Sequence, residues 1–167
     1  TLHAGDIAAV LAVDGIDDTA PPYPALVTLG RDSATAHILI DLEAAGALSI
    51  TADDTDTAAA MLSTIALELA VSPWAAEVNL TLVGPLLPGL AETLDHPSLI
   101  HIDDAARALA GDEVRAEAQR QHLAGSTVGQ KRANPQLADA WCPHVVLIAQ
   151  ELDDEDAARL AQIVTDL

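Results

Sequence analysis

Residues 53–84, DDTDTAAAMLSTIALELAVSPWAAEVNLTLVG, decide the fold because a helix pattern leads there into a strand pattern. Asp53 or Asp54 can cap the helix, since a short carboxylate accepts hydrogen bonds from the free N–H groups of a first turn. Apolar residues then recur at helical spacing, at Ala58, Leu62, Ile65, Ala66 and Leu69. The helix pattern stops at Ser72-Pro73, and Val78–Gly84 alternates apolar with polar side chains, which predicts a strand.

Upstream of this stretch, the sequence predicts a β-hairpin. Ala25–Gly30 and Ala36–Leu42 are short β-rich runs on either side of a polar turn at residues 31–35. A third short apolar run, Ala47–Thr51, follows Gly46. Residues 1–24 form a lead-in segment, because Pro21, Pro22 and Pro24 hold the chain in an extended form that is hostile to helices.

Downstream, strands and helices continue to alternate. Pro85–Gly89 is a turn and Ser98–Ile102 a short strand. A polar helix over Asp103–Leu123 has a thin apolar side, made of Ala106, Leu109 and Val114. After a loop at Ala124–Pro135, the chain gives a buried strand at Val145–Ala149 and then a last helix. That helix starts in the acidic run 151–156 and carries apolar residues on one face, at Leu160, Ile163, Val164 and Leu167.

These patterns predict one α/β domain over residues 25–167, with a mostly parallel sheet, flanking helices and an N-terminal β-hairpin. The length of 167 residues suits one domain with a sizeable core. Trp74 and Trp141 are expected to be packing anchors. Because the chain opens on Thr1 without Met, we expect it to be a piece excised from a longer multidomain protein.

Composition excludes several classes of function. There are 26 acidic and seven basic residues, a formal net charge of −19, which argues against binding to nucleic acid or to an anionic membrane. A single cysteine excludes a disulfide scaffold and any zinc site built on several cysteines. No apolar run approaches the roughly 18 residues of a membrane span, and the first residues do not resemble a signal peptide.

From Leu26 onward, the order of these patterns resembles a known family. The stretch LVTLGRD, HILIDLEAAGALSITADD, LALELAVSPWAAEVNLTLVG and later CPHVVLIAQEL is similar to the core of FtsK/SpoIIIE-type P-loop ATPases, including the type VII secretion motors. The resemblance covers residues 25–167 and rests on pattern rather than on invariant motifs. It implies a RecA/FtsK-like fold in which a hairpin leads into a strand, a phosphate loop and a helix.

A closer resemblance is to an intracellular segment of large actinobacterial membrane proteins. Those proteins join LysM peptidoglycan-binding modules to a transcriptional-activator (SARP-like) domain. The phrases that match are PALVTLG at residues 24–30, DLEAAGALS at residues 41–49 and SPW at residues 72–74. The resemblance implies a cytoplasmic location, in the cytoplasmic part of a membrane-anchored protein, with other domains of the same polypeptide or protein partners as contacts.

The phosphate loop of the resembled ATPases is degenerate in this chain. Such a loop needs G-x-x-x-x-G-K-[ST], because glycines let backbone N–H groups wrap the phosphates while the Lys and the hydroxyl bind phosphate and Mg²⁺. Here the corresponding window has neither glycine, and it places Ala58 and Ala59 where Lys and Ser/Thr belong. The vestigial phosphate-loop position, as we call it, consists of Ala52, Asp53, Asp54, Asp56, Thr57, Ala58 and Ala59. Three carboxylates there repel a triphosphate, and we expect them to cap the helix instead.

The other motifs of the resembled ATPases are also missing. The strand over residues 78–83 ends in Gly84 where the family places an Asp, and the strand over residues 145–149 ends in Ala149-Gln150 where it places Asp-Glu. Glu151 is either a vestigial base or a carboxylate at a helix start. Residues 125–132, GSTVGQKR, only superficially resemble a phosphate loop, since the spacing is wrong and no strand precedes them. We expect a flexible surface loop there.

Two further groups of residues have side chains that could take part in catalysis or metal binding. Ser98, His101 and Asp103 are the residue types of a hydrolase triad, but no G-x-S-x-G elbow accompanies them, so a surface or edge hydrogen bond is expected. Cys142 and His144 are potential metal ligands, as are His96, His101 and His122, but no metal-ligand spacing joins them. A half-buried Cys beside a His at the entry of a strand is therefore expected. The sequence predicts no catalytic residue, cofactor or metal.

Three functions are compatible with these observations. The first is a non-catalytic P-loop-like module that acts as a structural or protein-interaction domain. The second is a nucleotide-binding ATPase domain of the FtsK or secretion type. The third is a small-molecule sensor that uses the carboxyl ends of the strands, where open α/β sheets bind ligands. The oligomeric state is not predicted.

Overall fold

The computed structural model describes residues 23–72, 75, 78–95, 97–123, 125–132, 134 and 141–166. Within them the chain is an α/β fold with a two-stranded antiparallel hairpin, a three-stranded parallel sheet and flanking helices. In chain order the elements are β1 (Leu26–Arg31), β2 (His37–Asp41), α2 (Leu42–Ala45), α3 (Thr55–Val71), β3 (Asn79–Val83), α4 (Leu90–Leu94), β4 (Leu99–Ile102), α5 (Ala105–Leu123), α6 (Val128–Arg132), β5 (His144–Ile148) and α7 (Asp154–Asp166).

The parallel sheet is built around β3, which lies between β4 and β5. Leu80 is in register with Leu99 on one side and with Val145 on the other. Successive residues of β3 form hydrogen bonds alternately toward β4 and β5. The N–H of Leu80 donates to the backbone oxygen of Ser98, and the N–H of Asn79 donates to the backbone oxygen of Pro143. The predicted parallel sheet with flanking helices is therefore confirmed.

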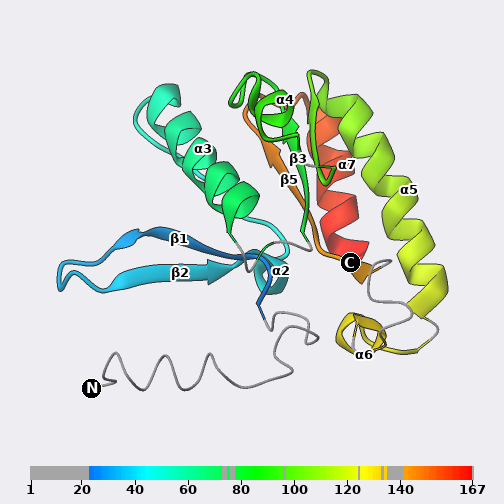
Figure 1. The fold of residues 1–167 in the computed structure, drawn as a ribbon. Coiled ribbons are helices and arrows are strands. Elements are labelled where there is room, and N and C mark those ends of the chain that lie inside the picture. Colours follow the sequence, from blue (N-terminus) through cyan, green and yellow to red (C-terminus); the bar gives the residue numbers. More distant parts are fainter. Residues whose placement is uncertain are drawn as a thin grey trace, which may run out of the picture.

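Helices cover both faces of this sheet, as Figure 1 shows with α3 on one side and α5 and α7 on the other. Leu80 and Leu82 of β3 belong to the larger core cluster, together with Ile65, Ala66 and Leu69 of α3. Val83 belongs instead to a cluster with Ala105 and Ala108 of α5. The strand is thus buried on both faces, because parallel strands with helices on either side have no face toward water.

The hairpin is attached to the body of the fold through α3. Val27 of β1 is fully buried in the larger core cluster. The side chain of Glu68 in α3 accepts hydrogen bonds from the N–H of Thr28 at 2.9 Å and from its hydroxyl at 3.0 Å. The turn between β1 and β2 is closed by the carboxylate of Asp32, which accepts from the N–H groups of Ala34 and Ala36. The predicted hairpin is confirmed.

On the opposite face, α5 and α7 pack against each other. Leu109 and Ala116 of α5 form a cluster with Ile163 of α7. At its edge, Arg159 of α7 makes a bidentate pair with Glu113 of α5, with distances of 2.9 and 3.0 Å. The hydrogen bond from Arg159 lowers the pKa of Glu113 and raises that of Arg159 itself. The two helices therefore form one continuous layer over the sheet.

Several predicted elements differ from the structure. Residues 47–51, the third short apolar run, have no regular secondary structure and are not part of either described sheet. The loop at 124–135 contains the helix α6, and α2 and α4 were not predicted at all. In α5, the predicted burial is confirmed for Leu109 but is wrong for Val114, which is 72% exposed, and the buried face also includes Ala105, Ala108 and Ala116.

Some predictions fall on residues that the structure does not describe. They include most of the lead-in segment, residues 1–22, together with Trp74 and Leu167. Trp141, the other predicted anchor, is described and is 5% exposed, which confirms its packing role. None of the described helices is both long and apolar enough to cross a membrane.

The central position of β3 generates a stability prediction. We expect Leu82→Ala to lower the free energy of unfolding by about 2–5 kcal/mol, because Leu82 is fully buried and its truncation leaves a cavity. Leu67→Ala is the matched control, since Leu67 lies on α3 with 48% exposure and should change stability by less than about 1 kcal/mol. Urea unfolding followed by circular dichroism measures both, and equal losses would contradict the assigned core.

Candidate functional site

The vestigial phosphate-loop position lies at the amino end of α3 and is occupied by the chain's own carboxylate. Asp54 is the N-cap of α3: its Oδ1 accepts the backbone N–H of Thr57 at 2.7 Å, and its Oδ2 accepts the Thr57 hydroxyl at 2.9 Å. These hydrogen bonds lower the pKa of Asp54. An N–H and a hydroxyl that would face a phosphate in an ATPase are therefore engaged within the helix cap.

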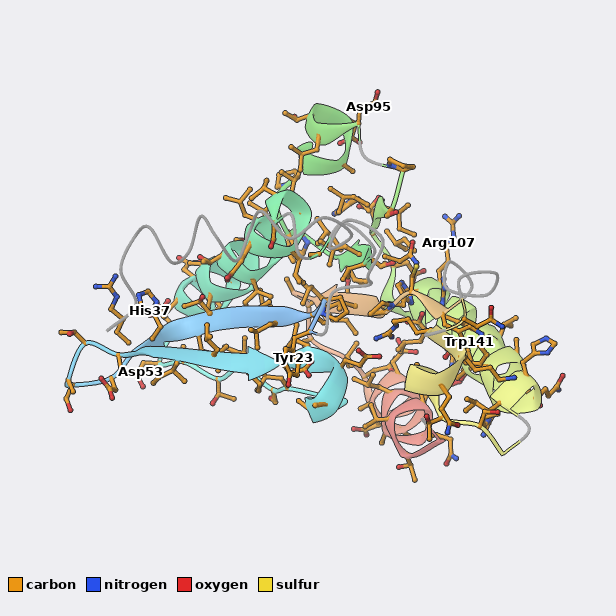
Figure 2. All side chains as sticks on the ribbon, turned by 60° about the horizontal axis from the view of Figure 1, so that its bottom comes forward. Tyr23, His37, Asp53, Asp95, Arg107 and Trp141 are labelled. Atoms are coloured by element: carbon orange, nitrogen blue, oxygen red, sulfur yellow. The ribbon has the colours of Figure 1, made fainter. Side chains whose placement is uncertain are left out.

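The remaining residues of this position add no group that could hold an anion. Ala52, Asp53 and Asp56 are exposed, whereas Ala58 and Ala59 are partly buried in the first turns of α3. Figure 2 shows Asp53 on the hairpin side of the molecule, far from Trp141. Each carboxylate would repel a phosphate about 4 Å away by roughly 1 kcal/mol in water and about 4 at an effective dielectric of 20. The predicted capping role is confirmed for Asp54.

At the end of β3, the backbone conformation and the approach of Gln150 disfavour the carboxylate of the resembled ATPases. Gly84 has a φ of +79°, a backbone conformation that favours glycine. A Cβ at this position would lie 3.1 Å from Oε1 and 3.3 Å from Cβ of Gln150, which follows β5. The two positions where acidic residues are expected from the resemblance are thus in direct contact, and they hold a glycine and an amide.

In the predicted hydrolase-like trio, His101 contacts both Asp103 and the backbone at the end of β3. Nε2 of His101 lies 2.7 Å from the backbone oxygen of Gly84, and its Nδ1 lies 3.6 Å from Asp103. The imidazole thus contacts the carbonyl at the end of β3, which confirms the expected edge hydrogen bond.

The metal-ligand candidates are not brought together either. Cys142 is partly buried just before β5, and His144 is the first residue of that strand, as expected. Among the described residues, no group of three or more His, Cys, Asp or Glu side chains could hold a metal ion. His122 lies in the last turn of α5, and His96 is outside the described residues.

The GSTVGQKR stretch does not form a flexible surface loop throughout. Its second half is the helix α6, and Arg132 at the end of α6 is 13% exposed. The guanidinium makes a bidentate pair with Glu43 of α2, and it also donates to the backbone oxygen of Trp141 at 3.1 and 3.2 Å. Arg132 thus joins the segment after the hairpin to the entry of β5, which is a structural rather than an anion-binding role.

A buried polar network was missed by sequence reasoning. Nε2 of His144 in β5 lies 2.8 Å from the hydroxyl of Thr81 in β3, and its Nδ1 lies 3.0 Å from Asp112 in α5. Thr81 is 3% exposed, and the side chains of His144 and Asp112 are 11% and 14% exposed. The order hydroxyl, imidazole, carboxylate is that of a nucleophile, a base and its orienting acid.

The burial of this network assigns it a structural role. Thr81 lies in the middle of β3 against α5 and lines neither of two cavities formed by the described residues. A nucleophile must be reached by its substrate, and this hydroxyl is covered. The network therefore ties β3, β5 and α5 together. The available signal was the position of Asp112 three residues after Leu109, which places a carboxylate beside the buried side of α5.

The more enclosed of those two cavities lies away from the place where a sensor pocket is expected. It is lined by the last residues of α3 and the first residues of β3 and β4, mainly Leu69, Ala70, Val71, Ser72, Val78, Leu80, Ser98 and Leu99. It is therefore found at the amino ends of the parallel strands. Ligands of open α/β sheets bind at the opposite, carboxyl end.

Comparison with protein-family models, curated proteins and solved structures finds no match to this chain.

The helix cap generates a prediction about Asp54. We expect Asp54→Ala to lower the melting temperature, because the N–H of Thr57 loses its acceptor, whereas Asp54→Ser should keep most of the stability. Asp53→Ala, next to the cap, is the control and should leave the melting temperature unchanged. If Asp53→Ala destabilises the protein as much as Asp54→Ala, the cap is assigned to the wrong residue.

The pH dependence of this effect follows from the lowered pKa of Asp54. The ionised carboxylate stabilises the fold at pH values above 3.8, its ordinary pKa, and this stabilisation is lost as the pH falls through the lower pKa of the folded state. The melting temperatures of the wild type and of Asp54→Ala should therefore approach each other as the pH falls below about 4.

The buried network generates a second prediction. We expect Thr81→Val to lower the free energy of unfolding by about 1–3 kcal/mol, because it removes the hydroxyl partner of His144 without changing the side-chain shape. Thr81→Ser should recover part of this loss. Thr64→Val on the exposed face of α3 is the control, with an expected change below about 0.5 kcal/mol. Unchanged stability of Thr81→Val would show that the network contributes nothing net.

Proposed function

We propose that this chain is a non-catalytic, degenerate P-loop module that serves as a structural or protein-interaction domain. The observation that carries the proposal is the cap of α3, where Asp54 holds the N–H and the hydroxyl of Thr57. A helix start that binds phosphate must leave its N–H groups open and must not face several carboxylates. At this helix start, the N–H of Thr57 is already engaged and three carboxylates, those of Asp53, Asp54 and Asp56, are present.

The end of the central strand supports the same proposal. Gly84 and Gln150 are in contact at the positions where the resembled ATPases place acidic residues, and the backbone of Gly84 disfavours any side chain. The layers around β3 nevertheless contain a buried apolar cluster on each face of the strand. An architecture that keeps its core without the groups for phosphoryl transfer fits a role in binding or support rather than in catalysis.

The larger context of this module follows from the resemblance of the sequence alone. The module would be a cytoplasmic segment of a longer actinobacterial protein that is linked to the cell envelope or to regulation. Its partners would be other domains of that polypeptide or other proteins. With a net charge of −19, nucleic acid is a poor partner for this segment.

A nucleotide assay tests the proposal. We expect millimolar ATP or GTP with Mg²⁺ to leave the melting temperature of the protein unchanged, both in the wild type and in Asp54→Ser, which keeps a cap and removes one negative charge. A ligand at 100 times its Kd stabilises a fold by about 2.7 kcal/mol, which a thermal shift detects. A clear shift in the wild type would contradict the proposal and favour a nucleotide-binding ATPase domain.

A further inference from the structure

Past its first turn, the outer face of α3 is exposed but carries no charged side chain. Ala60, Thr64, Leu67 and Val71 recur at helical spacing and form a continuous row, which we call the outer stripe of α3. All four are exposed, Leu67 by 48% and Val71 by 59%. Figure 1 shows the hairpin beneath α3 and no described helix beyond it. In a chain with a net charge of −19, an uncharged apolar helix face is typical of a covered surface.

The polar groups of α3 beside this stripe do not need water as a partner. The hydroxyl of Thr64 donates to the backbone oxygen of Ala60 at 2.9 Å, within the helix itself. Glu68 is the one charged residue of α3 past its first turn, and both oxygens of its carboxylate accept hydrogen bonds from Thr28 of the hairpin. Another apolar surface can therefore cover the stripe without leaving a polar group unpaired.

The chain enters the described fold close to the outer stripe. Thr28, which is bonded to Glu68 of α3, is only five positions after Tyr23, the first described residue. The run Ile7–Val13, with the sequence IAAVLAV, is apolar and uncharged and lies outside the described residues. The residues from Asp14 to Tyr23 span at most about 35 Å, and the 17 residues of α3 are about 25 Å long. The run can therefore reach every part of the stripe.

We propose that the outer stripe of α3 is the docking site of the chain's own run Ile7–Val13. A tether of this length gives the run an effective concentration on the order of millimolar, so a separate protein at lower concentration competes poorly for the same surface. A second copy of the chain is disfavoured as the occupant, because a net charge of −19 repels an identical molecule. The inference goes beyond the proposed function, since it concerns a strap within the chain that keeps an apolar surface from other contacts.

Methyl NMR of the full chain tests this contact. We expect nuclear Overhauser cross-peaks that join the methyl groups of Leu67 and Val71 to those of Ile7 and Leu11. Val114, which is 72% exposed on α5, is the matched control and should show no cross-peak to the run. A mixture of labelled and unlabelled protein distinguishes a contact within one chain from a contact between two copies.

A pair of variants tests which part of the chain makes the contact. Val10→Asp combined with Leu11→Asp should abolish the cross-peaks to Ile7, because a carboxylate is costly to bury against an aliphatic surface. Thr19→Asp combined with Ala20→Asp adds the same charge outside the run and should leave the cross-peaks unchanged. If the first variant does not fold, the wild-type cross-peaks still decide the question.

Three results would overturn the proposal. The first is the absence of cross-peaks between the outer stripe and residues 7–13 in the wild type. The second is cross-peaks that appear only between labelled and unlabelled molecules, which would make a second copy the occupant. The third is cross-peaks that survive the two aspartates at Val10 and Leu11. None of these results bears on nucleotide binding, so failure of this inference and failure of the proposed function are distinguishable.

Discussion

The structure depends on the complete burial of β3. Its backbone groups are shared between β4 and β5, and its side chains enter a different core on each face. Leu80 and Leu82 hold α3, and through α3 the hairpin, whereas Thr81 and Val83 hold α5. Because all the layers meet at this strand, the alternation of its side chains fixes which helix lies on which face. A shift of one residue would exchange the two cores.

The same architecture explains why the region that resembles a nucleotide site lacks the corresponding chemistry. The start of α3 is closed by Asp54, and the end of β3 approaches Gln150 so closely that only glycine fits well. Both features meet a local structural need. Asp54 supplies an acceptor at a helix end, and Gly84 allows two strand ends to pack closely. At the positions where the sequence resemblance implies phosphate- and metal-binding groups, the chain carries groups that complete the fold.

Sequence patterns were sufficient for the elements whose burial is periodic. The helix from Asp54 to Ser72 and the strands at 79–83, 99–102 and 144–148 follow directly from apolar spacing and caps. The run at 47–50 could not be judged this way, because a strand needs a partner and its neighbours are decided by the whole sheet. The core face of α5 was predicted correctly at Leu109 but not at Val114, because alanines dominate the buried side and Val114 faces water.

In the candidate site too, local interactions could be predicted from the sequence and long-range ones could not. The role of Asp54 was predictable, since capping depends only on residues within one turn. The Thr81–His144–Asp112 network was not, because its members come from three elements and the hydroxyl and the imidazole are separated by 63 positions. A buried histidine finds its partners through the tertiary fold, and no short sequence window contains them.

The distance in sequence between Asp112 and His144 affects the order in which α5 and β5 can assemble. During synthesis, α5 leaves the ribosome well before His144, so Asp112 must stay hydrated until β5 arrives. If α5 docked on β3 and β4 before β5 was in place, the carboxylate of Asp112 would be buried without its imidazole partner. The arrival of β5 supplies the imidazole that Asp112 contacts, which couples completion of the sheet to the docking of α5.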